Sequence, residues 1–152
     1  IAAWAKDNGR TLYDLLMDIY VDYGFSKEFT VNVVKPGKTG ADAIKQMMAD
    51  FRSNPPKELG GSKIVLWKDY QTLEATDENG NVTKLDMPTT SNVLQWFCND
   101  GTKVSVRPSG TEPKIKFYIE VKDNTMKCAG CYDSCCKAGE EKIEAIKKSL
   151  NL

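Results

Sequence analysis

The sequence predicts an α+β domain, a mainly antiparallel sheet of four or more strands with helices packed on one face and a further helix at the N-terminus. Three observations predict this class. Residues 102–121 alternate apolar and polar side chains on both sides of a short polar loop, as two half-buried strands do. Further short apolar runs are separated by turns that contain Gly and Asn. Helical spacing of apolar residues occurs near both ends and between Thr39 and Asn54.

The apolar residues within positions 2–23 predict a helix with one apolar face, with helical spacing from Leu12 onward. Thr11 is suited to cap the start of its main part, and Gly24 is suited to end it. The sequence begins with Ile1, inside this helical pattern. We therefore expect residues 1–24 to be the helical tail of a preceding domain and residues 25–152 to form the domain that follows. A stand-alone dimerisation helix is the alternative interpretation.

A strand and an amphipathic helix are expected next. Residues 29–33 alternate in the manner of a strand. Thr39, with Asp42 three residues later, is expected to cap the helix that follows. Residues 54–56, Asn-Pro-Pro, should end that helix. Its apolar face is formed by Ile44, Met47, Met48 and Phe51.

Four short strands are expected before the loop. Asn79-Gly80 predicts a hairpin, because both residue types accept positive φ. The sequence Asn-Asp-Gly at residues 99–101 should turn the chain directly into the strand that precedes the loop. The predicted strands are Lys63–Trp67, Tyr70–Ala75, Val82–Leu85 and Val93–Cys98.

The loop within residues 102–121 reads Arg-Pro-Ser-Gly-Thr-Glu-Pro and suits an oxyanion. Arg107 offers a planar set of donors that matches phosphate. Ser109 and Thr111 add hydroxyl groups, and the backbone amides from Ser109 to Thr111 could point into one concavity. Glu112 would repel a phosphate unless it points away or pairs with a lysine. On this chemistry alone, an ordinary turn between strands is the simpler interpretation.

The string Arg-Pro-Ser-Gly-Thr-Glu-Pro-Lys, followed by Ile-Lys-Phe-Tyr, resembles the phosphate-binding loop of the α-D-phosphohexomutases. The phosphoglucomutase/phosphomannomutase branch is the most similar. The resemblance implies that residues 25–152 form a C-terminal domain that binds the phosphate of the substrate. Some relatives have arginine where this chain has Tyr118, so Lys116 is our candidate for the second cationic contact. The other phosphate contacts implied are Arg107, Ser109, Gly110 and Thr111.

The resemblance also implies an activity for the parent protein, an isomerase that moves a phosphoryl group between O1 and O6 of a hexose. The serine loop, the Mg²⁺-binding loop and the sugar-contacting loop of that family do not occur in this sequence, which also has no histidine. We therefore expect no catalytic residue, metal site or bound cofactor here, and no turnover by the chain alone. The full enzyme would require Mg²⁺ and glucose 1,6-bisphosphate, and the expected partners are a hexose phosphate and the other domains of the enzyme.

The charge balance limits other partners. Basic and acidic residues number 21 each, which argues against binding to nucleic acid or an anionic membrane. No apolar run is long enough for a membrane span, and we expect a cytoplasmic protein. A non-enzymatic module for a phosphorylated ligand or RNA is the first alternative function.

The second alternative is a cysteine-based metal-binding or redox element in the final helix, which is predicted over residues 125–150. Four thiols lie close together in that segment, but their spacing differs from that of a usual zinc knuckle. Free thiols in a reducing compartment are the preferred interpretation, ahead of a metal site, with disulfides last. The four residues are Cys128, Cys131, Cys135 and Cys136.

Overall fold

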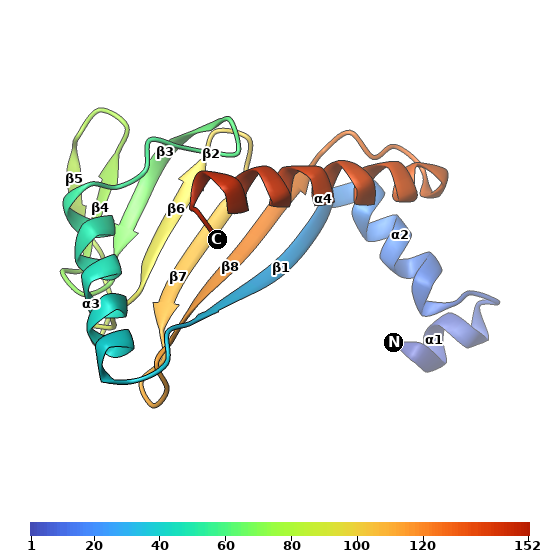
Figure 1. The fold of residues 1–152 in the computed structure, drawn as a ribbon. Coiled ribbons are helices and arrows are strands. Elements are labelled where there is room, and N and C mark those ends of the chain that lie inside the picture. The colour runs from blue at the N-terminus through green and yellow to red at the C-terminus, as the bar shows by residue number, and fades with distance from the viewer.

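An antiparallel sheet forms the centre of the fold (Figure 1). The computed structural model describes residues 1–152 apart from the side chain of Lys38. The strand order is β1-β8-β7-β6-β3-β4-β5, and β2 pairs with β3 beside this path. The strands are β1 (Phe25–Val34), β2 (Glu58–Leu59), β3 (Ser62–Asp69), β4 (Glu74–Asp77), β5 (Val82–Lys84), β6 (Leu94–Cys98), β7 (Lys103–Pro108) and β8 (Lys114–Asp123).

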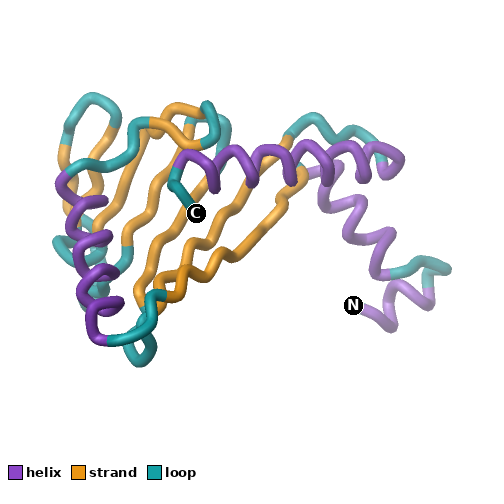
Figure 2. Tube along the Cα trace, viewed as in Figure 1, coloured by secondary structure: helices purple, strands orange, loops and turns teal.

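Two long helices cover one face of this sheet (Figures 1 and 2). They are α3 (Lys38–Ser53) and α4 (Tyr132–Ser149), the latter preceded by the short 3₁₀ turn η1 (Ala129–Cys131). Helices α1 (Ala2–Asp7) and α2 (Leu12–Tyr23) lie beyond the end of the sheet from which β1 starts. The predicted α+β class, with helices on one face and a helix at the N-terminus, is confirmed.

The main core lies between the sheet and these two long helices. Alternate residues of the central strands point into it, as period-two patterning requires. Burying each large apolar side chain there stabilises the fold by about 1.5–3 kcal/mol. From α3 and α4 the core receives Ile44, Met48, Ile143 and Ile146, and Leu150, the C-cap residue of α4, also belongs to it. From β6, β7 and β8 it receives Leu94, Trp96, Cys98, Val104, Val106, Ile115, Phe117, Ile119 and Val121.

A smaller apolar cluster connects α2 to the rest of the fold. Met17 of α2 is buried with Phe25 at the start of β1, and with Met126 and Cys135. The ring of Tyr20 also packs edge-on against that of Phe25, with 5.1 Å between the ring centroids. Helix α2 is therefore in direct contact with the α+β domain.

The boundaries predicted for α2 are confirmed. The Thr11 hydroxyl accepts a hydrogen bond from the Asp14 amide at 3.1 Å, and the Asp14 carboxylate accepts one from the Thr11 amide at 2.8 Å. This reciprocal arrangement satisfies amide groups that the first helical turn leaves without partners. The helix ends at Gly24, where φ is 93°.

The predicted N-cap of α3 is wrong. The helix begins at Lys38, and Thr39 lies inside its first turn. Gly37 occupies the N-cap position with a φ of 83°, so the chain turns into the helix earlier than the Thr39–Asp42 pattern indicates. Asp42 forms an ion pair with Lys45 at 3.6 Å.

The strand predicted over Tyr70–Ala75 is also largely wrong, since β4 begins only at Glu74. A turn precedes it, in which the Asp69 carboxylate accepts a hydrogen bond from the Gln71 amide at 2.8 Å and Leu73 has a φ of 59°. The other predicted elements are present with shifted ends. The hairpin predicted at Asn79-Gly80 joins β4 to β5.

Candidate functional site

The candidate site is the hairpin loop that connects β7 to β8, beside the first turns of α3 (Figure 1). The register of the two strands ends with Pro108 opposite Ile115. The Ser109 amide then donates to the Lys114 carbonyl at 2.8 Å, which closes the loop. The Lys35 amide donates to the Pro113 carbonyl at 2.9 Å. The loop is thus attached to the segment between β1 and α3 as well as to its own hairpin.

All five residues predicted to contact phosphate line one hollow beside this loop. Its volume is about 390 Å³. The hollow is lined by Arg107, Pro108, Ser109, Gly110, Thr111, Glu112, Lys114, Lys116 and Tyr118. The fold therefore brings the predicted residues together, and their role as phosphate contacts stays a prediction.

Two of the three cations in this hollow are available to a ligand. Arg107 and Lys116 are directly opposite each other in the ladder between β7 and β8, so their side chains share one face of the sheet. Neither forms an ion pair among the side chains that the structure describes. Lys114 pairs with Glu112, and this hydrogen bond lowers the pKa of the Glu112 carboxyl. The expectation that Glu112 pairs with a lysine is confirmed.

The amides of the loop are arranged differently from the expected three-amide concavity. The Ser109 amide is already bound to the Lys114 carbonyl. The Ser109 hydroxyl oxygen accepts hydrogen bonds from the amides of Thr111 and Glu112, at 3.4 and 3.3 Å. In the described part of the chain, the Gly110 amide has no hydrogen-bond partner within the protein. The Ser109 hydroxyl therefore stabilises the loop from within. Of the described loop amides from Ser109 to Glu112, that of Gly110 is the one left to donate to a ligand.

Gly110 is also the point at which the loop backbone is most accessible. A Cβ atom built on Gly110 would meet no atom within 4 Å. The residue does not belong to the glycines with positive φ, so the turn itself does not require its conformational freedom. What glycine provides here is open space beside the backbone, through which a ligand can approach the amide.

Sequence reasoning missed residues that other elements bring to the loop. Asn32 of β1 lies directly opposite Lys116 and shares its face of the sheet. Lys45 of α3 and Asn92 line a second hollow, of about 450 Å³, on the other side of the loop. The Asn92 side chain accepts a hydrogen bond from Arg52 at 2.7 Å. No local pattern marks these three residues, because only the pairing of β1 with β8 and the packing of α3 place them there.

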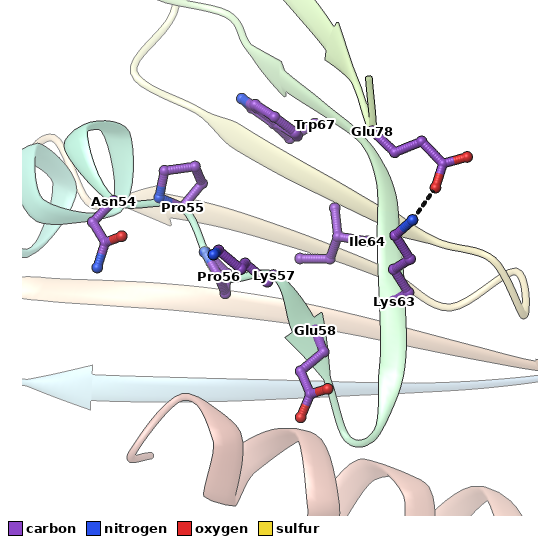
Figure 3. Close-up of a pocket in the computed structure, with 9 residues that line it drawn as sticks. All are labelled: Asn54, Pro55, Pro56, Lys57, Glu58, Lys63, Ile64, Trp67 and Glu78. Carbon is purple, nitrogen blue, oxygen red and sulfur yellow. Dashed lines mark hydrogen bonds and ion pairs between the residues drawn. The ribbon is translucent and has the colours of Figure 1, made fainter. Parts of the chain in front are cut away.

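Another hollow lies where the end of α3 faces β3, also of about 450 Å³ (Figure 3). Its wall includes the Trp67 ring and the side chain of Ile64. The Nζ atom of Lys63 lies 2.5 Å from a carboxylate oxygen of Glu78 on the rim. None of the predicted site residues lines this hollow. Its lining contains two lysines and two glutamates, Lys57, Lys63, Glu58 and Glu78, so it has no net positive charge and suits an anion less well than the loop does.

The cysteines do not assemble into a metal site in the described residues, which contain no group of three or more Cys, His, Asp or Glu side chains placed to hold a metal ion. All five cysteines are free thiols. Cys98 belongs to the main core, and Cys135 to the smaller cluster. The helices that the structure describes include none long and apolar enough to cross a membrane.

The fold and the site define a class, an antiparallel α+β domain with a cationic hairpin loop at one end of its sheet. Comparison with known families gives the particular family. The model for the C-terminal domain of phosphoglucomutase/phosphomannomutase matches residues 31–127. The chain belongs to this family, which confirms the resemblance seen in the loop.

Curated relatives agree with this assignment. A phosphoglucomutase from Staphylococcus epidermidis is 36% identical over 121 residues, which cover 79% of this chain and 22% of the relative. A phosphoglucomutase from Staphylococcus aureus is 38% identical over 122 residues, covering 80% and 22%. The chain thus spans about a fifth of the length of the curated relatives it matches.

A solved structure was also matched, the open form of the exocytosis-sensitive phosphoprotein parafusin, a phosphoglucomutase from Paramecium. The match covers 91% of this chain and 23% of that chain, with 16% identity and a TM-score of 0.44. Similarity at this level adds nothing to the family match.

Proposed function

We propose that this chain is the domain of a phosphoglucomutase-like isomerase that binds the phosphate group of a hexose phosphate. The parent enzyme would transfer a phosphoryl group between O1 and O6 of the hexose. The family match and the names of the relatives support an enzyme of this type. Binding of phosphate is our inference from the loop, and the single observation that carries it is the pairing of Arg107 with Lys116 across the ladder.

The contribution of this pair is electrostatic and geometric. A guanidinium group presents several donors in one plane, which suits two phosphate oxygens, and a neighbouring ammonium group adds a compact positive charge. The ladder holds Arg107 and Lys116 side by side before any ligand arrives, so less ordering entropy is lost on binding. Each hydrogen bond to a charged group contributes on the order of 1.5–3 kcal/mol. The Gly110 amide is a third donor in this proposal.

In this proposal the domain positions the substrate and performs no bond chemistry. A grip on the phosphate that is remote from the reacting oxygen allows binding energy far from the reaction to orient the reacting end of the sugar. Mg²⁺ and glucose 1,6-bisphosphate would be requirements of the complete enzyme, with Mg²⁺ held by its other domains. We also place the enzyme in the cytoplasm.

The alternative functions are less well supported. The family match favours a mutase domain over a non-enzymatic module for RNA or a phosphorylated ligand. The equal number of basic and acidic residues provides no general attraction for RNA.

The test is substitution of the loop in the full-length enzyme. Arg107→Ala should lower kcat/KM for a hexose phosphate by roughly 10- to 150-fold, the equivalent of one charge-assisted hydrogen bond. Lys116→Ala should also lower it, and Gly110→Ala should weaken binding without lowering the melting temperature, because its Cβ would meet no protein atom within 4 Å. Lys84→Ala is the matched control, since Lys84 is exposed on β5 at the other edge of the sheet.

Binding can be measured separately from catalysis by following backbone NMR signals during titration with hexose phosphate. Signals of Gly110 and its neighbours should shift, and an unphosphorylated hexose should leave them unchanged. Unchanged kcat/KM in Arg107→Ala, or shifts confined to another surface, would contradict the proposal.

A further inference from the structure

Two cysteines form a close pair at the opposite end of β8 from the phosphate loop. The 3₁₀ turn η1 is closed by a hydrogen bond from the Cys131 amide to the Cys128 carbonyl at 3.0 Å. This turn places both thiols on one side, and their Sγ atoms lie 3.0 Å apart. Cys128 is exposed and Cys131 is half-buried. A disulfide bond needs sulfur atoms about 2.05 Å apart, so the two sulfur atoms would have to approach each other by about 1 Å to form one.

Two of the other three cysteines, Cys98 and Cys135, are less suited to redox chemistry. Cys98 lies in the main core, where burial raises the pKa of its thiol to about 11. Burial and the nearby Asp123 carboxylate raise the pKa of Cys135. The pKa of Cys131, in contrast, is lowered, chiefly because of its hydrogen bond with the Cys128 thiol. Thiolates are the reactive form of cysteine, so the lowered pKa makes Cys131 more reactive than Cys98 and Cys135.

We propose that Cys128 and Cys131 are a reversible dithiol–disulfide site that exchanges with small-molecule disulfides such as glutathione disulfide. The Cys131 thiolate attacks one sulfur of glutathione disulfide, forms a mixed disulfide and releases one glutathione thiolate, which takes up a proton. Cys128 then loses its proton to water and attacks the Cys131 sulfur, which expels the second glutathione as a thiolate that takes up a proton. Two protein thiols are oxidised to one disulfide, and one glutathione disulfide is reduced to two glutathione molecules.

The proposed pair lies where helix α4 begins. Cys131 is the residue immediately before α4, and its side chain packs against the smaller apolar cluster that includes Met17 of α2. A disulfide would covalently fix the turn that begins α4. The phosphate loop lies at the other end of β8, so this inference does not depend on the proposed phosphate binding.

The sequence allows the pair to be separated from the other thiols by digestion. Cleavage after Lys127 and before Asp133 releases residues 128–132, which carry the proposed pair. Residues 133–137 carry Cys135 and Cys136 in a different peptide. The intact protein is equilibrated in glutathione buffers of increasing oxidation, quenched with an alkylating reagent, digested and analysed by mass spectrometry.

In oxidising buffer, peptide 128–132 should lose two hydrogen atoms and escape alkylation, while peptide 133–137 stays fully alkylated. Return to reducing buffer should restore both thiols. Cys128→Ser and Cys131→Ser should each prevent formation of this disulfide. Cys136→Ser is the matched control, in which the disulfide should still form. Full alkylation of peptide 128–132 in every buffer, or a disulfide that links the two peptides, would overturn the proposal.

Discussion

A part-buried polar network holds the C-terminal half of α4 against the sheet, and its centre is Asp100 in the turn between β6 and β7. The Asp100 carboxylate accepts hydrogen bonds from the Ser62 hydroxyl at 2.5 Å and the Thr102 amide at 3.0 Å. The Nζ atom of Lys142 lies 3.0 Å from the same carboxylate and also donates to the Gly60 carbonyl at 3.0 Å. We expect Asp100→Asn to destabilise the protein in a pH-dependent way.

The size of the effect follows from the pKa of Asp100. Burial by itself would raise this pKa, but hydrogen bonds from Ser62, Thr102 and Lys142 lower it from 3.8 to about 2. This difference in pKa between the unfolded and folded states corresponds to about 2 kcal/mol in the free energy of unfolding. The Asp100 side chain is 37% exposed, so solvent screening reduces the contribution to about 1 kcal/mol. Because the folded-state pKa is the lower one, the stabilisation is complete above the unfolded-state value of 3.8 and is lost as the pH falls towards 2.

The assay is urea unfolding followed by circular dichroism, from neutral pH down to about pH 3. Asp100→Asn should lower the free energy of unfolding by about 1 kcal/mol at neutral pH, and its difference from the unsubstituted protein should shrink below pH 4. Asp86→Asn is the control, since Asp86 is exposed. A deficit that stays constant across the pH range, or an equal deficit in the control, would refute this account of the network.

Two further predictions concern Gly40 and catalysis. Gly40→Ala should destabilise the protein by about 1–3 kcal/mol in the same unfolding assay, because its Cβ would lie 1.7 Å from the Lys35 carbonyl oxygen. Gly130→Ala should be tolerated, since its nearest neighbour would be the Cys128 sulfur at 3.9 Å; equal loss in both variants would argue against the steric explanation. The 152-residue chain alone should show no mutase turnover in a coupled assay with Mg²⁺ and glucose 1,6-bisphosphate, and activity that persists through further purification would contradict the domain assignment.

The parts of the fold that were predictable depend on signals within a few residues. The cap of α2 at Thr11 and its end at Gly24 follow from side-chain chemistry next to the backbone groups they satisfy. The alternation in residues 102–121 reports one buried face and predicts β7 and β8 well. The candidate site was recognised through the resemblance of its loop to a known family, and its predicted residues all lie in one hairpin.

The parts that were not predictable depend on tertiary structure. The turn before β4 relies on the Asp69 carboxylate and on a positive φ at Leu73. Leucine seldom adopts a positive φ, so the sequence does not indicate this turn. The two-residue strand β2 exists only through its pairing with β3. Asn32 reaches the neighbourhood of Lys116 because β1 pairs with β8, and the engaged amide of Ser109 depends on how the hairpin closes.

The pairing of β1 with β8 also has a consequence for how the chain reaches its native state. Its register runs from Phe25 opposite Asp123 to Val34 opposite Lys114, so the ladder joins two distant parts of the chain. During synthesis β1 leaves the ribosome long before its partner, whereas β6, β7 and β8 can pair as successive hairpins. Until β1 docks, β8 is an edge strand whose backbone donors and acceptors on one side have no partner and are open to pairing with other molecules. The docking of β1 is therefore the step at which slow folding and aggregation would compete.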